Sequence, residues 1–173
     1  EMQEKKFMEA IEILKKNGIK PKWIHAGGDS EALLKQKNPE INLLRIGLGI
    51  YGISDLDLEL KPALEFSSSL VGIKKIKKGE KVGYKGTFTA PRDMKLGVVP
   101  VGYYEGLPIS LSNNGSLELK GKQCQIIGRI CMNYTMIDLG EIDAEIGDEV
   151  IVYSRNPQNP NSIQNMANKA GTI

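Results

Sequence analysis

Two different spacings of hydrophobic and polar residues divide the chain. Near its start, apolar residues recur at the intervals of a helix, at Phe7, Ile11 and Leu14, and Gly18 follows as a typical helix end. Short apolar runs and a second helical stretch come next. The predicted order is helix 5–17, strand 22–26, helix 29–36 and strand 43–46. This alternation predicts βα-units of a parallel sheet.

From Leu64 onward the pattern changes to short β-branched and apolar runs that are separated by turn residues. The predicted strands are 67–75, 81–90, 95–101, 116–119, 123–130, 134–138 and 149–153. Asn114-Gly115 is typical of a tight two-residue hairpin, and a last helix is predicted from Ser162 to about Lys169. Short strands at this spacing indicate an antiparallel barrel or sandwich.

The two parts together predict an α+β fold with two domains, 1–57 and 58–173. Residues 54–62 lack a clear period and form the predicted connector. A length of 173 residues fits one or two domains, and 40% hydrophobic and 25% charged residues are ordinary values for a globular protein. The net charge of +2 is too small to indicate a nucleic-acid partner.

Neither a membrane segment nor a metal site is predicted. No apolar run reaches the ~20 residues of a transmembrane helix, and no signal-peptide pattern opens the chain. The two cysteines, Cys124 and Cys131, and the single histidine, His25, lack the spacing of zinc ligands. Two cysteines without a disulfide pattern indicate reduced thiols and a cytoplasmic location.

Residues 45–52 are glycine-rich and satisfy the G-x-G-x-x-G pattern through Gly47, Gly49 and Gly52. Dinucleotide binding would also need a helix that starts within the pattern, and residues 53–57 lack helical periodicity. Unshielded glycine N–H groups can hold a single phosphate, although a simple tight turn explains the same residues. Ser30 is a second phosphate candidate if it begins a helix, or else a plain helix cap.

Two tyrosines, Tyr84 and Tyr103, each follow a glycine at the end of a β-branched run. A tyrosine phenol has a pKa of about 10 and serves as a general base only where its surroundings lower that value. Because tyrosine also favours strands, both residues have an ordinary structural interpretation. His25, at the end of a predicted strand, likewise fits a hydrogen-bonded histidine without a chemical role.

Four segments, 45–52, 82–90, 101–106 and 127–133, and the turn at 147–150 resemble the pyridoxal-phosphate-dependent alanine racemases in order and spacing. The resemblance covers nearly the whole chain. It implies a (β/α)8 barrel that holds the cofactor and a mostly antiparallel β-domain after it. The chain would contain the last βα-units of the barrel and the β-domain.

The resemblance also implies the chemistry of the parent protein, which is racemisation of L- and D-alanine by two bases. Tyr84 would be the base on one face of the substrate Cα and would act in the active site of the partner subunit of a homodimer. A lysine would act on the other face. Tyr103 and Asn133 would line the substrate side, and the backbone N–H of Met132 would bind the substrate carboxylate.

Pyridoxal phosphate would contact residues of the first part of the chain, according to the same resemblance. Arg45 would face the pyridine nitrogen, and His25 would support Arg45. The phosphate would be held by Ser30 and by the backbone N–H groups of Gly47 and Leu48.

The chain departs from the family pattern at several positions. Residues 25–30 are one residue longer than the usual motif and contain Asp29 instead of asparagine, and Asn133 stands where many members have aspartate. No lysine lies in the Ala-Tyr-Gly context of the cofactor lysine, and both chain ends look cut. The sequence therefore predicts a racemase fragment that is inactive alone. A serine or broad-specificity amino-acid racemase, and a non-catalytic β-domain or dimerisation module, are the alternatives.

Overall fold

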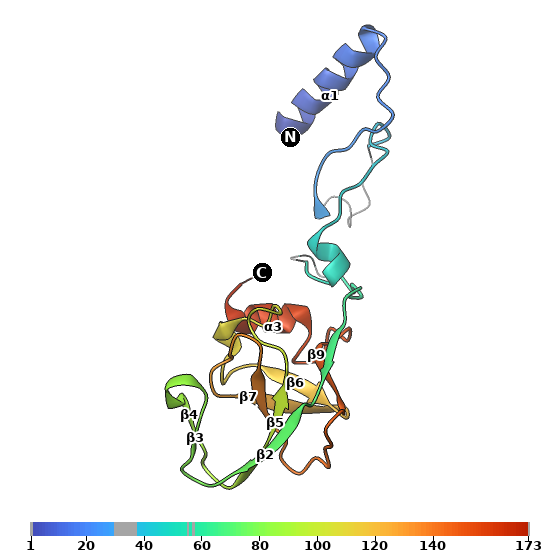
Figure 1. Cartoon of the computed structure of the whole chain (residues 1–173). Helices are drawn as coiled ribbons and strands as arrows, with labels where there is room; N and C mark the ends of the chain where they lie inside the picture. The colour runs from blue at the N-terminus through green and yellow to red at the C-terminus, as the bar shows by residue number, and fades with distance from the viewer. Residues whose placement is uncertain (1, 30–37, 55, 57, 173) are drawn as a thin grey trace. The chain divides into compact units, whose positions relative to one another are not determined.

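The computed structural model describes residues 2–29, 38–54, 56 and 58–172 (Figure 1). The chain forms two compact units, residues 1–47 and residues 48–173. The sequence prediction placed the boundary later, at 57/58. The two units are described separately below.

The first unit begins with helix α1, Met2–Lys16, which confirms the predicted helix and starts it earlier. Gly18 ends it with a left-handed φ of 72°, and its N–H donates to the Lys15 carbonyl at 3.0 Å. Ile11 is the buried residue of this helix. The Lys15 ammonium lies 2.8 Å from the Glu40 carboxylate and so connects the helix to a later segment of the same unit.

The predicted strands 22–26 and 43–46 are wrong, because these segments form no ladder. They do lie side by side, since the N–H groups of Asn42 and Leu43 both donate to the Ile24 carbonyl at 3.0 and 3.2 Å. A ladder needs a new partner at every second residue, whereas here one carbonyl receives both bonds.

The apolar residues of these segments are also uncovered within the described unit. Trp23 is 57% exposed, and Leu44 and Ile46 are exposed as well. Strands of a parallel sheet normally have both faces covered, so these segments lack the packing that the predicted strands require. Most of the predicted helix 29–36 lies outside the described residues.

The second unit contains a seven-stranded antiparallel sheet with the order β1-β9-β6-β7-β8-β5-β2 (Figure 1). The strands are β1 Phe66–Ser69, β2 Gly72–Ile76, β5 Met94–Val99, β6 Ser116–Leu119, β7 Lys122–Ile127, β8 Thr135–Asp138 and β9 Glu149–Tyr153. The sequence prediction of a mostly antiparallel β-domain is confirmed. The bounds of β6 and β9 match those predicted.

The sheet curls because its two outer strands are consecutive in the chain. Only Leu70 and Val71 separate β1 from β2, which are at opposite ends of the strand order. The Leu70 N–H donates to the Asp148 carbonyl next to β9, and the Val71 N–H donates to the Val98 carbonyl in β5. The predicted single strand 67–75 is therefore wrong, since the chain changes its partner strand between these two residues.

The inner face of the curled sheet holds the main hydrophobic core. Its buried members are mostly leucine, isoleucine and valine at alternate strand positions, as the period of two requires. They include Val99 on β5, Leu117 and Leu119 on β6, Ile126 on β7, Ile137 on β8, and Val150 and Val152 on β9. Burial of this apolar surface is the main term that stabilises the domain.

Residues 81–90 form two short strands and a turn instead of the one predicted strand. Strands β3 Lys81–Val82 and β4 Phe88–Thr89 pair with each other, and a 3₁₀ turn, Tyr84–Gly86, joins them. Gly83 and Lys85 have φ values of 81° and 62°. Because a strand cannot contain such left-handed residues, the prediction of a continuous strand is wrong here.

The predicted hairpin at Asn114-Gly115 is also wrong. A 3₁₀ turn, Ile109–Leu111, precedes these residues, and the Gly115 N–H closes a turn onto the Leu111 carbonyl at 2.8 Å. The tight two-residue hairpin is Lys120-Gly121, between β6 and β7, with φ values of 50° and 72°. Two positive φ values are the signature of a type I′ turn.

The last element is helix α3, Ile163–Ala170, which confirms the predicted C-terminal helix. Its N-cap is Ser162, whose side-chain oxygen accepts a hydrogen bond from the Asn165 N–H at 3.3 Å. Gly171 ends the helix in the left-handed conformation. The helix contacts the 3₁₀ turn at Ile109–Leu111 (Figure 1).

The two cysteines are expected to differ strongly in reactivity. Burial raises the pKa of the Cys124 thiol to about 11, whereas Cys131 is only partly buried. At about pH 8, a disulfide reagent should modify the Cys131 thiol of the 173-residue chain quickly, and the Cys124 thiol only after unfolding. The Cys131→Ser variant should lose the fast phase, and a fast reaction that persists in this variant would contradict the assignment.

Candidate functional site

The sequence-predicted catalytic and substrate-binding residues lie on three loops, 83–87, 102–106 and 128–134, which are called the loop cluster below. Tyr84, Tyr103 and Met132 are 68%, 46% and 47% exposed. Neither tyrosine lies in a strand, so the interpretation of both as ordinary sheet residues is wrong. Their side chains are therefore accessible to a ligand or to another chain.

The Tyr84 turn is seated directly against residues 128 and 129. A Cβ on Gly83 would lie 2.6 Å from the Arg129 backbone nitrogen, and one on Gly128 would lie 3.0 Å from the Val82 carbonyl oxygen. Both glycines have positive φ values. The close approach fixes the backbone on which the exposed Tyr84 side chain is carried.

Asn113 adds a side-chain link between these two loops, which the sequence analysis missed. Its Oδ1 accepts a hydrogen bond from the Gly128 N–H at 2.6 Å, and its Nδ2 lies 3.4 Å from the Thr87 carbonyl oxygen. The only signal in the sequence was a polar residue in a predicted turn. Its partners are far away in the chain, so no local pattern identifies them.

The Tyr103 loop is joined to the Met132 loop by the backbone. The N–H groups of Tyr103 and Tyr104 donate to the carbonyl oxygens of Cys131 and Met132 at 3.1 and 3.0 Å. A Cβ on Gly102 would lie 2.2 and 2.3 Å from the same two oxygens, so only glycine fits at this position. The structure thus brings Tyr103 and Met132 together on adjacent segments.

Glu105 joins the same two loops through its side chain. Its carboxylate accepts a hydrogen bond from the Asn133 side-chain amide and another from the Gly102 N–H, each at 2.8 Å. These two bonds, the one from Asn133 first, hold the pKa of the Glu105 carboxyl below its usual range. The sequence analysis selected Asn133 but missed Glu105.

Residues of the sheet domain anchor the ends of these loops. The buried Thr135 hydroxyl donates to the Val101 carbonyl at 2.6 Å, and the Ile130 N–H donates to the Ser112 hydroxyl at 3.0 Å. The Tyr153 hydroxyl donates to the Gly106 carbonyl at 2.8 Å, and burial raises the pKa of Tyr153. The loop cluster is therefore a fixed extension of the sheet.

The cofactor residues predicted from the resemblance lie mainly in the first unit. The Arg45 guanidinium donates from Nη2 to the Gly27 carbonyl at 2.6 Å, and the Gly47 N–H donates to an Asp29 carboxylate oxygen at 2.5 Å. Arg45 and His25 are exposed. The Gly47 N–H is thus placed to bind an anionic oxygen, which is the chemistry a phosphate requires.

The other two predicted phosphate ligands are Leu48 and Ser30. Leu48 begins a 3₁₀ turn, Leu48–Tyr51, at the start of the second unit. Ser30 lies outside the described residues. In the described part of the chain, the hydrogen bond given by Arg45 goes to a backbone carbonyl, and the predicted support by His25 stays a prediction.

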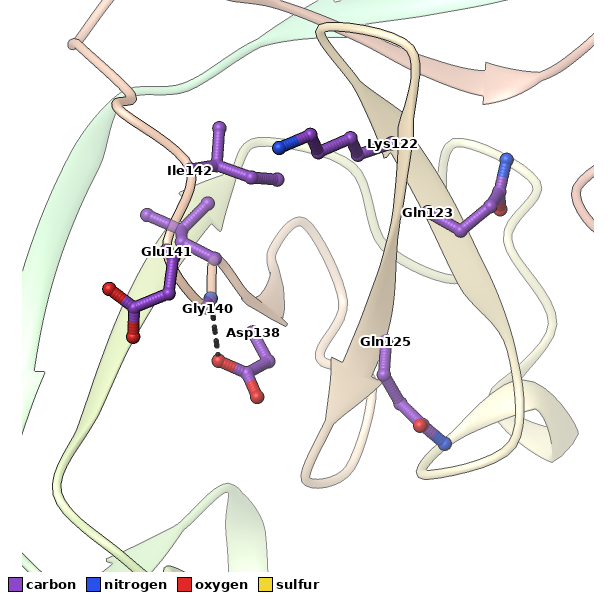
Figure 2. Close-up of a pocket in the computed structure, with 8 residues that line it drawn as sticks. Lys122, Gln123, Gln125, Asp138, Gly140, Glu141 and Ile142 are labelled. Atoms are coloured by element: carbon purple, nitrogen blue, oxygen red, sulfur yellow. Dashed lines mark hydrogen bonds between the residues drawn. The ribbon is translucent and has the colours of Figure 1, made fainter.

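A separate polar pocket of about 300 Å³ lies between β7 and residues 138–142 (Figure 2). Its Asp138 carboxylate accepts from the Gly140 N–H at 3.0 Å, as Figure 2 shows, and from the Arg92 guanidinium at 2.9 Å. None of the sequence-predicted site residues lines it. Since its Asp138 carboxylate is already paired and no predicted site residue lines it, the loop cluster remains the candidate site.

The described residues contain neither a metal-binding cluster nor a membrane-spanning helix. Among them, no three histidine, cysteine, aspartate or glutamate side chains are grouped so as to hold a metal ion. No helix in the described part of the chain has the length and apolar character needed to span a bilayer.

Comparison with known proteins identifies the class to which this fold and loop cluster belong. Residues 63–173 match the family model of the alanine racemase C-terminal domain. The chain is 39% identical to the alanine racemase of Lactobacillus acidophilus over 165 residues, which cover 90% of this chain and 43% of the relative. The chain belongs to the alanine racemase family.

Solved structures agree with this assignment. The alanine racemase of Clostridium difficile, solved in complex with cycloserine, matches with a TM-score of 0.84 and 26% identity over 99% of this chain and 46% of that one. The Bartonella henselae enzyme, solved with covalently bound pyridoxal phosphate, matches in fold with a TM-score of 0.73 at 22% identity over 99% and 47%. The chain spans less than half the length of the relatives it matches.

Proposed function

We propose that the protein containing this chain is a pyridoxal-phosphate-dependent racemase that interconverts L- and D-alanine in the cytoplasm. The chain would contribute the end of the (β/α)8 barrel, residues 1–57, and the β-domain, residues 58–173. The observation that carries the proposal is the exposed Tyr84 phenol on a turn whose backbone is fixed by glycine contacts, in a chain of the alanine racemase family.

Tyr84 would move the proton on one face of the substrate Cα. In one direction its phenolate oxygen accepts that proton, and in the other direction its hydroxyl returns it. The lysine for the opposite face would come from a region that this chain does not contain. A base on each face explains how one site can act on both enantiomers.

The substrate carboxylate would bind at the Met132 backbone N–H. Among the described residues, this N–H donates no hydrogen bond, and Met132 is exposed. Tyr103 and Asn133 would line the same subsite, because both lie on loops that are bonded to Glu105 or to the Met132 segment. A small amino acid suits a subsite bounded by such fixed loops.

When bound, pyridoxal phosphate would withdraw electrons from the substrate Cα and make its proton acidic. The donors in the first unit fit this group, since the Gly47 N–H already binds a carboxylate oxygen. Gly47, Leu48 and Ser30 would hold the phosphate, and Arg45, supported by His25, would face the ring nitrogen. Because arginine does not lose its proton, Arg45 would keep that nitrogen unprotonated and limit side reactions.

A homodimer would place Tyr84 in the active site of the partner subunit. The loop cluster exposes several tyrosines and a methionine, residue types that are common in protein interfaces. These are Tyr84, Tyr103, Tyr104, Met132 and Tyr134. An exposed group of this composition supports association through the loop cluster.

The test is a racemisation assay on the full-length gene product that carries this sequence. With pyridoxal phosphate, we expect it to form D-alanine from L-alanine, detected with a D-amino-acid oxidase, and to turn over alanine faster than serine. Faster turnover of serine would favour a serine or broad-specificity racemase. A protein that carries the cofactor and racemises neither would contradict the proposal and favour a non-catalytic module.

A further inference from the structure

Glu105 occupies a special position in the loop cluster, because one of its carboxylate oxygens binds its own loop and the other binds the Met132 loop. Oε2 accepts from the Gly102 N–H, directly before Tyr103, and Oε1 accepts from the Asn133 amide, directly after Met132. The two bonds are 2.8 Å long each.

We propose that Glu105 is a positioning residue that, with Asn133 as its matched partner, sets the geometry of the substrate-carboxylate subsite. This inference rests on the proposed function, which assigns the Met132 N–H to that subsite. Glu105 touches no reacting atom in this scheme. It acts by fixing Met132 and Asn133 relative to Tyr103.

The backbone contacts alone hold one side of this arrangement. The N–H groups of Tyr103 and Tyr104 bond to the carbonyl oxygens of Cys131 and Met132, which holds the peptide groups on both sides of Met132. Asn133 follows these carbonyls, and its amide is held by Glu105. Removing the Glu105 bond would therefore release the Asn133 side chain and loosen the segment that follows the substrate-binding N–H, while the backbone bonds keep the loops together.

The chemistry of the pair explains why residue 133 must be neutral here. An asparagine Nδ2 is a donor and suits a carboxylate at 2.8 Å. An aspartate at 133 would put a second carboxylate at the same distance, and two like charges so close repel each other. The pair therefore works with one charge, which lies on Glu105 and is compensated by two donors.

A reciprocal exchange tests the pair. In Glu105→Gln the amide oxygen is one acceptor for two donors, so one of the two bonds is lost. In Asn133→Asp two carboxylates face each other, so the bond between the loops is lost. In the double variant Glu105→Gln/Asn133→Asp, the glutamine oxygen can accept from Gly102 and its nitrogen can donate to Asp at 133. The double variant thus restores both bonds with the donor and acceptor exchanged.

We expect each single variant of the full-length protein with bound cofactor to raise the KM for alanine about tenfold, with kcat within about threefold, since a hydrogen bond to a charged group is lost. The Kd of propionate, a carboxylate without an amine, should rise equally. The double variant should return both values to within about twofold of the wild type. Glu141→Gln, an exposed substitution at the separate pocket, should change neither.

Unchanged KM and propionate Kd in the single variants, or a double variant whose defect equals the product of the two single defects, would overturn the inference. If the single variants are insoluble, a soluble double variant with wild-type constants supports the pair, and an insoluble double variant counts against it. A wild-type protein that does not racemise alanine would instead refute the proposed function.

Discussion

Replacing Tyr84 with phenylalanine is expected to lower alanine racemisation by ~10²–10⁴-fold in both directions, the usual range for loss of a general acid–base group. Both directions suffer because each uses the phenol once, as base or as acid. The measurement is kcat for L- and D-alanine in the full-length protein. The fold should survive, since the Tyr84 side chain is 68% exposed.

A second measurement separates loss of one base from general damage. In deuterated water, the base on the other face should still exchange the Cα hydrogen of one enantiomer but not of the other. Tyr104→Phe removes an equally exposed phenol from the neighbouring loop and is the matched control, expected to keep near-normal turnover. Near-normal turnover in Tyr84→Phe itself would remove Tyr84 from its proposed role.

Gly102→Ala is expected to reduce the free energy of unfolding by about 3 kcal/mol, because overpacking against an atom that cannot move is costly. The new Cβ would lie 2.2 and 2.3 Å from the carbonyl oxygens of Cys131 and Met132, which are backbone atoms. The whole loop must therefore shift. Urea unfolding of the 173-residue chain, with an unchanged slope m, measures the loss.

Gly72→Ala is the matched control for this substitution. Gly72 lies in β2, and a Cβ there would meet only the Val98 side chain at 3.5 and 3.6 Å, an ordinary contact. Its stability should stay within about 1 kcal/mol of the wild type, since alanine loses less entropy on folding than glycine. Equal stability of the two variants would contradict the prediction, because it would show that the loop at Gly102 shifts at little cost in free energy.

Local patterns in the sequence were sufficient where an element depends on its own residues. The helix after Ser162 has its cap, its apolar face and its terminal Gly171 within one short segment, and it was predicted nearly to its bounds. Strands 116–119 and 149–153 alternate in burial along their whole length, and they match as well. Turn residues in the sequence marked where these strands end.

Prediction failed where distant partners decide the conformation. Nothing local marks the change of partner strand at Leu70 and Val71. The preference of Asn114-Gly115 for a hairpin was overridden because the preceding segment forms a 3₁₀ turn. Gly83 argues against a continuous strand at 81–90, because a glycine inside a strand pattern often marks a bend.

The residues of the candidate site also differ in how far the sequence alone could identify them. Tyr84, Tyr103 and Met132 could be named only through the resemblance, since tyrosine after glycine in a β-branched run has ordinary explanations. Glu105 was missed because its partner Asn133 is 28 residues away. The position of Asn133 is conspicuous in the sequence, but its bond to a carboxylate becomes visible only when the two loops are folded together.

The wide separation of β1 and β9 has a consequence for how the domain is made. Ser67 lies opposite Ile151, so the first strand of the sheet to leave the ribosome can pair only after the last strand has emerged. Pairing of such distant segments raises the contact order and slows folding. During synthesis, β1 would remain a bare edge that can pair with a neighbouring nascent chain until Glu149 and the residues after it emerge.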